Sequence, residues 1–227
     1  MAHILFIYKQ FPAPSVGHAG GESLFRMMRA LYKRGHRLSL VARILDEEKQ
    51  HLPSVHAICD HVATVPHHGA MNGPRMSRLV HSYLALRRAA ARALQTWQPD
   101  LVHIETLQTA IAVLGLRRPP ASYRTQDVNW FLMQQAEAAT AAAAETTTNV
   151  VTTSRSTTEG RTPNRSLFAR IKRRGLQWLE LWVARQHELV VAISEGDRRL
   201  LAPGCPSHDV LLLPLAPGVT PRPDVRP

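Results

Sequence analysis

The sequence predicts an α/β protein with a doubly wound, mostly parallel sheet. Short apolar runs alternate with amphipathic helical segments along most of the 227 residues. The runs are continuously apolar, as in strands that are buried on both faces of a parallel sheet. No internal repeat is visible. Repeated strand–helix alternation of this kind is typical of open sheets with helices on both faces.

The first third of the chain predicts a strand–helix–strand unit. His3–Tyr8 is a continuous apolar run, and a loop rich in glycine and proline follows it. Gly35 is a natural helix stop, and residues 36–44 (HRLSLVARI) read as the second strand. The two strands are expected to be parallel with a right-handed crossover. The helix between them has one apolar stripe, formed by Leu24, Met27, Met28, Leu31 and Tyr32.

The middle of the chain continues the alternation. A short strand is predicted at 61–66, a long helix at 73–97 and a buried strand at 99–105. The inward face of this helix is predicted to carry Met76, Leu79, Val80, Tyr83, Leu86, Ala90, Leu94 and Trp97. Its outer face is predicted to carry Arg75, Arg78, Arg87, Arg88 and Arg92.

The second half predicts three more strands and their helices. The expected elements are a helix at 107–116, a strand at 121–125, a helix at 130–144, a strand at 188–194, a helix at 195–202 and a strand at 209–214. A further long helix is marked by Phe168, Ile171, Gly175, Trp178, Leu179 and Trp182. The chain is therefore interpreted as one Rossmann-like domain over residues 1–213.

Two segments do not fit the alternation. Residues 136–166 are rich in Ala and Thr, and Glu145–Asn164 is predicted to be a low-complexity insertion that buries too little surface to order itself. The last residues, 214–227, are rich in proline and are predicted to be a linker.

Composition bounds the choice of partners and compartment. Lys and Arg number 28 against 17 acidic residues, a net charge of +11, which favours anionic partners unless the arginines only solvate helix faces. Two cysteines, Cys59 and Cys205, make a disulfide framework improbable and favour a cytoplasmic location, with peripheral attachment to an anionic membrane surface open. Aromatic residues are only 6% and fall mostly on apolar stripes, which argues against a nucleic-acid binder. His67 and His68, adjacent in a loop, are expected to be solvated.

The loop Gln10–Glu22 is the first candidate site. In open parallel sheets, ligands bind beyond the carboxyl ends of the strands. Gly17, Gly20 and Gly21 precede the expected helix start, where free amides and the helix dipole favour a phosphate. The spacing is not that of a dinucleotide or P-loop motif. The alternative is that Gly20 and Gly21 only let the helix pack close to the strand.

Two other strand ends carry polar side chains. His103 and Glu105 are two residues apart on one strand, so both point to the same face and are candidates for proton transfer or sugar binding, unless one caps the next helix. Arg124, Gln126 and Asp127 follow the next strand, and Asp127 is equally suited to be a helix N-cap. Ser194 is predicted to be an N-cap rather than a nucleophile.

The order of these motifs resembles the N-terminal half of family 4 glycosyltransferases. The resemblance rests on ILFIY, FPAP and GG, on PDLVHIE, YRT and VVAIS, and on the closing LLPLAPGV. That family has the GT-B architecture, two Rossmann-like domains facing across a cleft, and retains the anomeric configuration. The resemblance implies donor phosphates or acceptor near Gly20 and Gly21, with Gly17 and Glu22 of the same loop. It also places His103–Glu105 and Arg124–Asp127 on the acceptor side, and residues 212–219 at the hinge to a second domain.

Two departures from the family pattern qualify this expectation. Many relatives have a histidine where Gln126 and Asp127 follow the RT pair, and glutamine cannot transfer protons. The second domain, which grips the nucleotide-sugar in the family, has no counterpart within these residues. The expected function is therefore that of a glycosyltransferase N-terminal domain, inactive alone, with a nucleotide-sugar as co-substrate, no cofactor or metal, and a carbohydrate or lipid-linked acceptor. The alternative is a non-enzymatic Rossmann-like binding module.

Overall fold

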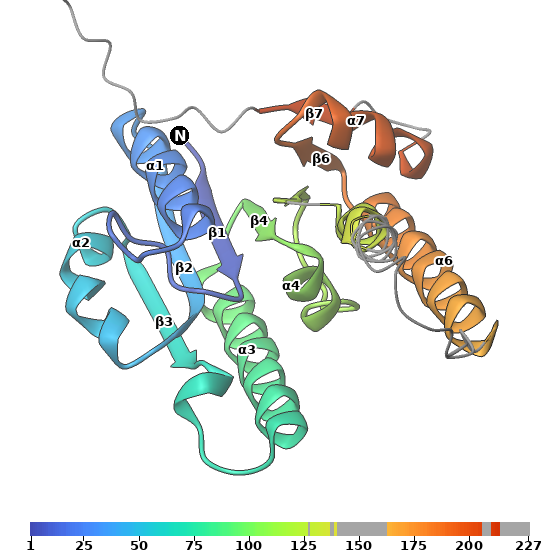
Figure 1. The fold of residues 1–227 in the computed structure, drawn as a ribbon. Helices are drawn as coiled ribbons and strands as arrows, with labels where there is room; N and C mark the ends of the chain where they lie inside the picture. The colour runs from blue at the N-terminus through green and yellow to red at the C-terminus, as the bar shows by residue number, and fades with distance from the viewer. Residues whose placement is uncertain (127, 137–138, 140–162, 206–209, 214–227) are drawn as a thin grey trace, which may run out of the picture.

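A computed structural model of the chain describes residues 1–126, 128–136, 139, 163–205 and 210–213, and shows a seven-stranded sheet flanked by helices (Figure 1). The strand order is β3-β2-β1-β4-β5-β6-β7, and all six pairings between these strands are parallel. The predicted fold class is confirmed. The strands are β1 (His3–Tyr8), β2 (Arg37–Ile44), β3 (His61–Pro66), β4 (Leu101–Glu105), β5 (Ala121–Arg124), β6 (Leu189–Ala192) and β7 (Val210–Leu212).

The predicted helices are found in the structure, but their first and last residues differ from the prediction. They are α1 (Ala19–Lys33), α2 (Leu52–His56), α3 (Arg75–Trp97), α4 (Leu107–Ala112), α6 (Pro163–Arg185) and α7 (Glu195–Leu201). Residues 129–136 are also helical. The 3-10 turns are η1 (Glu47–His51), η2 (His68–Ala70) and η3 (Ala202–Gly204). The sequence analysis missed η1 and α2, because this stretch is too short to show a helical period.

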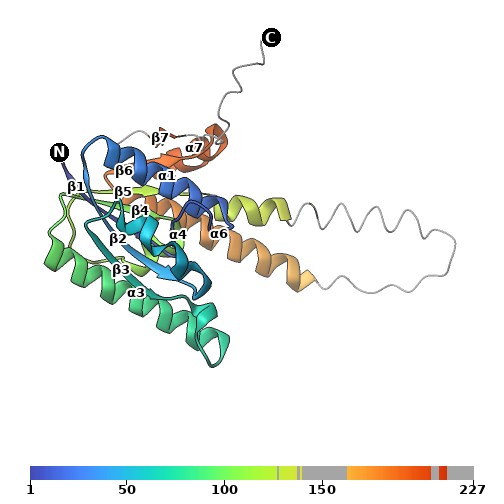
Figure 2. The same cartoon turned by 90° about the vertical axis from the view of Figure 1, so that its left-hand side faces the viewer.

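The chain reverses direction across the sheet between β1 and β4. It begins at the centre with β1, moves outward to β3 and returns through α3 to β4, on the other side of β1. Figure 2 shows the sheet between α1 on one side and α3 on the other. The connections that follow β1 and β4 therefore lie on opposite faces of the sheet. In open parallel sheets, a crevice outside the strand ends at such a point is where ligands bind.

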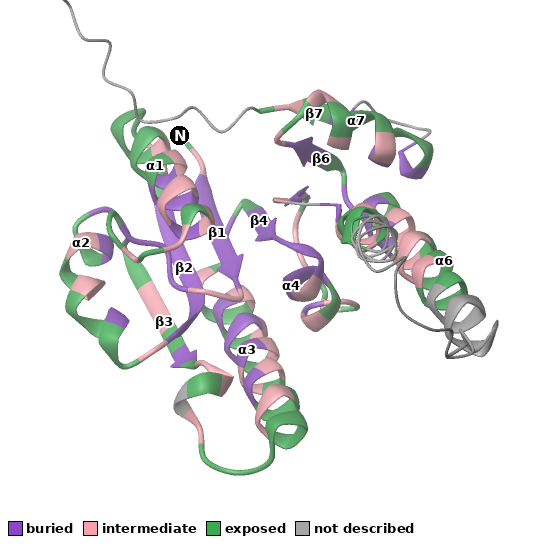
Figure 3. Ribbon diagram, in the orientation of Figure 1, coloured by how far each residue is buried: buried purple, intermediate pink, exposed green. Residues whose placement is uncertain are grey.

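Each face of the sheet has its own core. The central strands β1 and β2 are buried along most of their length (Figure 3). On the α1 face, alternate β1 residues Ile4, Phe6 and Tyr8 pack with Leu24 and Met28. On the opposite face, the other strand residues pack against α3, α4, α6 and α7 in one larger cluster. The continuous apolar runs in the sequence follow from this burial on both sides.

The predicted inward face of α3 is wrong at its N-terminal end. Met76 is 69% exposed and Val80 is 51% exposed, whereas both were expected to face the sheet. The fully buried positions are mostly small and lie along a neighbouring stripe, formed by Ser82, Leu86, Ala89, Ala90 and Ala93. Small side chains let a helix approach a sheet closely, so a stripe defined by large apolar residues misjudged the rotation of this helix.

Three other large side chains are more exposed than the sequence predicted. Tyr32 of α1 is 47% exposed, and on α6 Ile171 and Trp178 are 61% and 66% exposed. The Trp178 ring stacks on Trp182 with an interplanar angle of 10°. Trp178 and Trp182 of α6 are therefore only partly used in the core.

The predicted insertion and linker lie largely outside the described residues. Glu145–Asn164 overlaps the described part only at the start of α6, and 214–227 lies wholly outside it. The proposed domain boundary at 213 therefore stays a prediction.

Candidate functional site at the carboxyl edge of the sheet

Three neighbouring strands end together and bring four predicted site residues into contact. The β1–β4 register pairs Ile7 with Ile104, and the β4–β5 register pairs Glu105 with Arg124. Tyr8, Glu105 and Arg124 therefore lie in one row across the sheet. Because alternate residues of a strand share a face, all three side chains lie on the α1 face.

Glu105 lies at the centre of a buried charged cluster. Its Oε1 atom is 2.6 Å from Nε of Arg124 and 3.0 Å from Nε2 of His103. The side chains of Glu105, Arg124 and His103 are only 1%, 2% and 8% exposed. The prediction that His103 and Glu105 share a face is confirmed. Because these side chains are buried, a bound substrate contacts them only indirectly, through the side chains that cover them.

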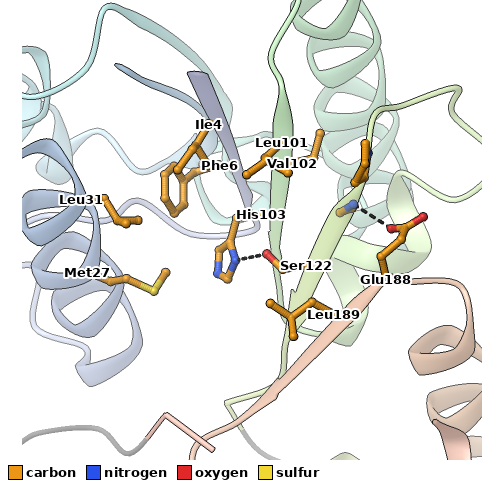
Figure 4. A pocket seen from close by; sticks show the side chains of 12 residues that line it. Ile4, Phe6, Met27, Leu31, Leu101, Val102, His103, Ser122, Glu188 and Leu189 are labelled. Carbon is orange, nitrogen blue, oxygen red and sulfur yellow. Dashed lines mark hydrogen bonds between the residues drawn. The ribbon is translucent and has the colours of Figure 1, made fainter. Parts of the chain in front are cut away.

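His103 is held from its other ring nitrogen as well. Nδ1 of His103 lies 2.7 Å from Oγ of Ser122 on β5, and the ring packs 5.3 Å from that of Phe6. These contacts form one wall of a cavity of about 300 Å³ beside α1, with Met27 and Leu31 on the other side (Figure 4). The cavity extends toward the amino ends of the strands. It therefore lies below the carboxyl edge, and His103 connects the two regions.

Gln126 forms the upper layer of the cluster. Its Nε2 atom donates to Oε2 of Glu105 at 3.3 Å and to the Tyr8 hydroxyl at 3.2 Å. The Tyr8 hydroxyl donates to Oε1 of Gln10 at 2.8 Å. Burial raises the pKa of Tyr8, so this hydroxyl stays protonated at neutral pH. Gln10 and Gln126 are half-buried, so they can offer hydrogen bonds to the hydroxyl groups of a ligand.

The glycine-rich loop ends one turn earlier than the sequence predicted. Helix α1 begins at Ala19, so Gly20 and Gly21 lie in its first turn rather than before it. His18 is the N-cap, and its Nδ1 accepts a hydrogen bond of 2.9 Å from the Gly21 amide. That amide is therefore not free for a phosphate, which weakens the argument for an anion site at this helix end.

Packing accounts for both helical glycines. A Cβ atom on Gly21 would collide with Cε1 of His18 and lie 2.8 Å from the carbonyl oxygen of Phe11. A Cβ on Gly20 would overlap the side-chain amide of Gln126. Gly20 thus lets α1 approach the end of β5, and this brings the first loop and Gln126 together. Gly17 has φ +73°, which favours glycine at that position.

Further contacts involve Arg124 and the other predicted site residues. Glu22 lies on α1, where its Oε2 atom is 3.6 Å from Nη2 of Arg26. Arg124 reaches α1 through a 3.5 Å contact between Nη2 and Oγ of Ser23. Asp127 lies outside the described residues, so its predicted roles stay untested. Ser194 is confirmed as an N-cap, because its Oγ accepts a 3.0 Å hydrogen bond from the Asp197 amide.

The sequence analysis gave no role to three polar residues at this edge. Tyr8 is the last residue of β1, and Lys9 and Gln10 follow it, with Gln10 at the start of the candidate loop. Lys9 donates through Nζ to Oε1 of Gln108 at 3.1 Å. Thr106 follows β4 with φ 70°, a strained conformation for a β-branched residue, and such strain clusters at functional sites. The position of these residues at strand ends was the available signal.

Neither a metal cluster nor a membrane span is found in the part of the chain that the structure describes. No three His, Cys, Asp or Glu side chains are grouped there to hold a metal ion. No described helix has the length and apolarity that crossing a bilayer requires. Cys59 and Cys205 are both free and buried, and burial raises the pKa of the Cys59 thiol to about 12.

Comparison with known protein families finds a match over part of the chain. Residues 20–126 match the family described as Glycosyltransferase Family 4. The matched region begins at Gly20 and ends at Gln126, the two residues that meet at the crevice. Among curated proteins, no sequence matches the chain.

Solved structures share the fold at low sequence identity. Sucrose-phosphate synthase from Thermosynechococcus elongatus is 11% identical, with a TM-score of 0.57 over 94% of this chain and 48% of its own. TcCGT1 in complex with UDP is 10% identical, with a TM-score of 0.52 over 95% of this chain and 51% of its own. LpCGTa in complex with UDP is 12% identical, with a TM-score of 0.50 over the same shares. The chain thus spans about half the length of these structures.

The fold is Rossmann-like and matches about half of solved structures such as sucrose-phosphate synthase. The match over residues 20–126, together with the shared fold, fits the N-terminal domain of family 4 glycosyltransferases. The resemblance found in the sequence is confirmed.

Proposed function

We propose that this chain is the acceptor-side domain of a glycosyltransferase that moves a sugar from a nucleotide-sugar to a hydroxyl group. The observation that carries the proposal is that residues far apart in the matched sequence lie together at one edge of the sheet. Gly20, Gln126 and the Glu105 cluster, far apart in sequence, meet at the carboxyl edge of the sheet. Two of the solved structures with this fold contain UDP, which supports a nucleotide-sugar as donor.

In this proposal the residues at the crevice bind the acceptor rather than transfer its proton. Gln126 and Gln10 offer hydrogen bonds to acceptor hydroxyls, and Tyr8 orients both amides. Glu105 and Arg124 neutralise each other and fix the amide of Gln126 from below. His103 and Glu105, the predicted catalytic candidates, act through Gln126 and are positioning residues. Transfer with retention and a metal-free, cofactor-free reaction are parts of the proposal.

The donor site is proposed to be completed by a second domain. The chain spans about half of the structures that share its fold, and the resemblance to family 4 implies a second domain that faces this one across a cleft. This domain alone is therefore expected to be inactive. The net charge of +11 supports attachment to an anionic membrane surface, and the buried free thiols fit a cytoplasmic location.

The test is sugar transfer by the complete gene product, with a panel of labelled nucleotide-sugars and acceptors. The proposal expects release of the nucleotide to depend on acceptor, and Gln126→Ala to raise the acceptor KM about tenfold because a hydrogen bond to substrate is lost. Gln95→Ala, on the exposed face of α3, is the matched control. Nuclear magnetic resonance of the product reports the anomeric configuration. No turnover with any nucleotide-sugar would contradict the proposal.

The burial of His103 and Glu105 favours one alternative, a non-enzymatic binding module. Such a module would bind a carbohydrate through Gln10 and Gln126 without transferring a sugar. Carbohydrate binding by the complete gene product, without nucleotide release under any condition, would identify this alternative.

A further inference from the structure

Arg43 is a buried cation with no carboxylate partner among the described residues. It is the seventh residue of β2, near the carboxyl end of the strand, and is 2% exposed. The ion pairs of the described part of the chain do not include it. A buried charge that lacks a counter-ion is costly, so its retention calls for a functional explanation.

Neutral groups hold the guanidinium in place. Nε of Arg43 donates to the carbonyl oxygen of Lys9 at 2.7 Å, and Nη1 donates to Oγ of Ser82 at 3.3 Å. Nη2 donates to the hydroxyl of Tyr83 at 3.4 Å, and the Tyr83 ring lies 4.2 Å from Cζ. These contacts fix the orientation of the side chain but leave its charge uncompensated.

The surroundings of Arg43 are also basic. Nη1 of Arg43 lies 3.4 Å from Nδ1 of His68. Arginine only donates, so Nδ1 accepts and the ring proton of neutral His68 is on Nε2, free to donate. Burial, followed by the charge of Arg43, lowers the pKa of His67 to about 4. The charge of Glu48 acts in the opposite direction. Both histidines are half-buried, so this pair is only partly exposed to solvent.

An apolar groove of about 470 Å³ adjoins this basic cluster. It runs between α3 and α4, and its exposed apolar residues include Val80, Leu84 and Ile111, which are 51%, 43% and 40% exposed. Two of its lining residues also contact the cluster. Tyr83 contacts Arg43, and Gln108 accepts the hydrogen bond from Lys9. The groove therefore begins where the positive charge is concentrated.

We propose that Lys9, Arg43 and His68 form a subsite for the phosphate of an amphiphilic acceptor, whose hydrocarbon chain lies in the groove between α3 and α4. Lys9 and His68 are half-buried and donate to the phosphate, while buried Arg43 supplies the charge that compensates it. An alkyl phosphate matches both halves of this surface, a cationic end and an apolar channel. This inference rests on the proposed function and names its acceptor class, a lipid phosphate.

The test is calorimetric titration of the 227-residue chain with hexyl phosphate, inorganic phosphate and hexyl glucoside. The proposal expects hexyl phosphate to bind at least tenfold more tightly than either of the other two, because only it engages both parts. Each buried methylene contributes up to about fourfold. Equal binding of hexyl phosphate and inorganic phosphate would overturn the groove assignment. Equal binding of hexyl phosphate and hexyl glucoside would overturn the phosphate subsite.

Variants separate the two parts of the surface. Lys9→Ala and His68→Ala should each weaken hexyl phosphate about tenfold and leave hexyl glucoside unchanged, with Lys49→Ala as the exposed control. Ile111→Ser should weaken hexyl phosphate and leave inorganic phosphate unchanged, with exposed Leu211→Ser as its control. Equal effects of a variant and its control would contradict the assignment.

Arg43 itself has a separate readout. Arg43→Met should weaken phosphate binding and raise the pKa of His67 measured by nuclear magnetic resonance, whereas a merely structural role predicts no change in phosphate affinity for a folded variant. If this variant does not fold, the Lys9 and His68 variants still decide the proposal. Calorimetry on this chain is independent of sugar transfer. Absence of binding here with transfer to neutral acceptors intact would overturn the subsite and leave the proposed function standing.

Discussion

The Nε atom of Arg124 lies 2.6 Å from Oε1 of Glu105, and neither side chain is more than 2% exposed. This ion pair joins β4 to β5 at the carboxyl edge of the sheet. The other carboxylate oxygen of Glu105 accepts a hydrogen bond from the half-buried side-chain amide of Gln126. The binding surface of the crevice thus depends on a buried pair that a ligand does not touch.

Replacing Glu105 by glutamine should therefore destabilise the fold strongly. The change leaves a buried guanidinium without its counter-ion, and we expect a loss of about 3 kcal/mol in the free energy of unfolding. Urea denaturation followed by circular dichroism measures it. Glu195→Gln, which breaks exposed ion pairs with Arg198 and Arg199, is the control and should change stability far less. Similar losses in both variants would contradict the importance of the buried pair.

Two glycines in helices should respond in opposite directions to alanine. In Gly21→Ala the new methyl group meets the Phe11 carbonyl oxygen and the His18 ring, so we expect a loss of about 1–3 kcal/mol. In Gly175→Ala of α6 nothing lies within 4 Å, and helix propensity predicts a gain of about 0.5–1 kcal/mol. Thermal and urea unfolding test both. A Gly21→Ala protein with unchanged stability would show that the glycine is not needed for packing.

Buried Glu180 predicts a stability that falls as pH rises. Burial raises its pKa from 4.5 to about 7 in the folded protein, although Asn129 donates to both carboxylate oxygens through its amide and side chain. Because the folded pKa is the higher one, the favourable contribution is complete below pH 4.5 and is lost as pH rises through about 7. The change is on the order of 3 kcal/mol between these limits.

The comparison with Glu180→Gln isolates this effect. His187, whose pKa burial lowers to about 4, acts in the opposite direction and loses its favourable contribution as pH falls from 6.5. It is present in both proteins, so it cancels in the difference. We expect the wild-type protein to lose stability relative to Glu180→Gln between pH 4.5 and 7.5 in urea titrations. A difference that does not vary with pH would contradict the assignment.

Gln126→Glu should impair acceptor use by charge rather than by shape. The substitution places a second carboxylate where Gln126 now donates to Glu105 at 3.3 Å. Two carboxylates at this distance oppose each other's ionisation, so the pKa of one of them is raised. The activity of the complete gene product should therefore fall as pH rises above this raised pKa and recover at lower pH. The pH profile of kcat/KM measures it. A profile identical to that of the Gln95→Glu control would contradict this role for Gln126.

The sequence predicted the sheet well because its signal is local. Continuous apolar runs such as His3–Tyr8 identify buried parallel strands, and alternation along β4 correctly placed His103 and Glu105 on one face. The rotation of α3 was not predictable in the same way, because small alanines such as Ala89 and Ala93 are buried whereas the larger Met76 is exposed. A hydrophobic scale gives such small residues little weight.

The site was predicted by position but not by contact. Strand ends indicated Arg124 and Gln126, yet the ion pair with Glu105 depends on strand register, which no local pattern encodes. Arg43 was assigned to a strand and nothing more. Arg43 matters because no carboxylate pairs with it in the described part of the chain. This could not be predicted from the sequence, because the neighbours of Arg43 come from the strands, α3 and the loop after β3.

Titration of the 227-residue chain alone with UDP-sugars, in a calorimeter, tests the central claim most directly. If this chain is the acceptor-side half of a two-domain glycosyltransferase, it should give no saturable heat below millimolar UDP-sugar, while the complete gene product binds in the micromolar range. Micromolar binding of a UDP-sugar by the chain alone would contradict the account, because the donor site would then lie within this domain.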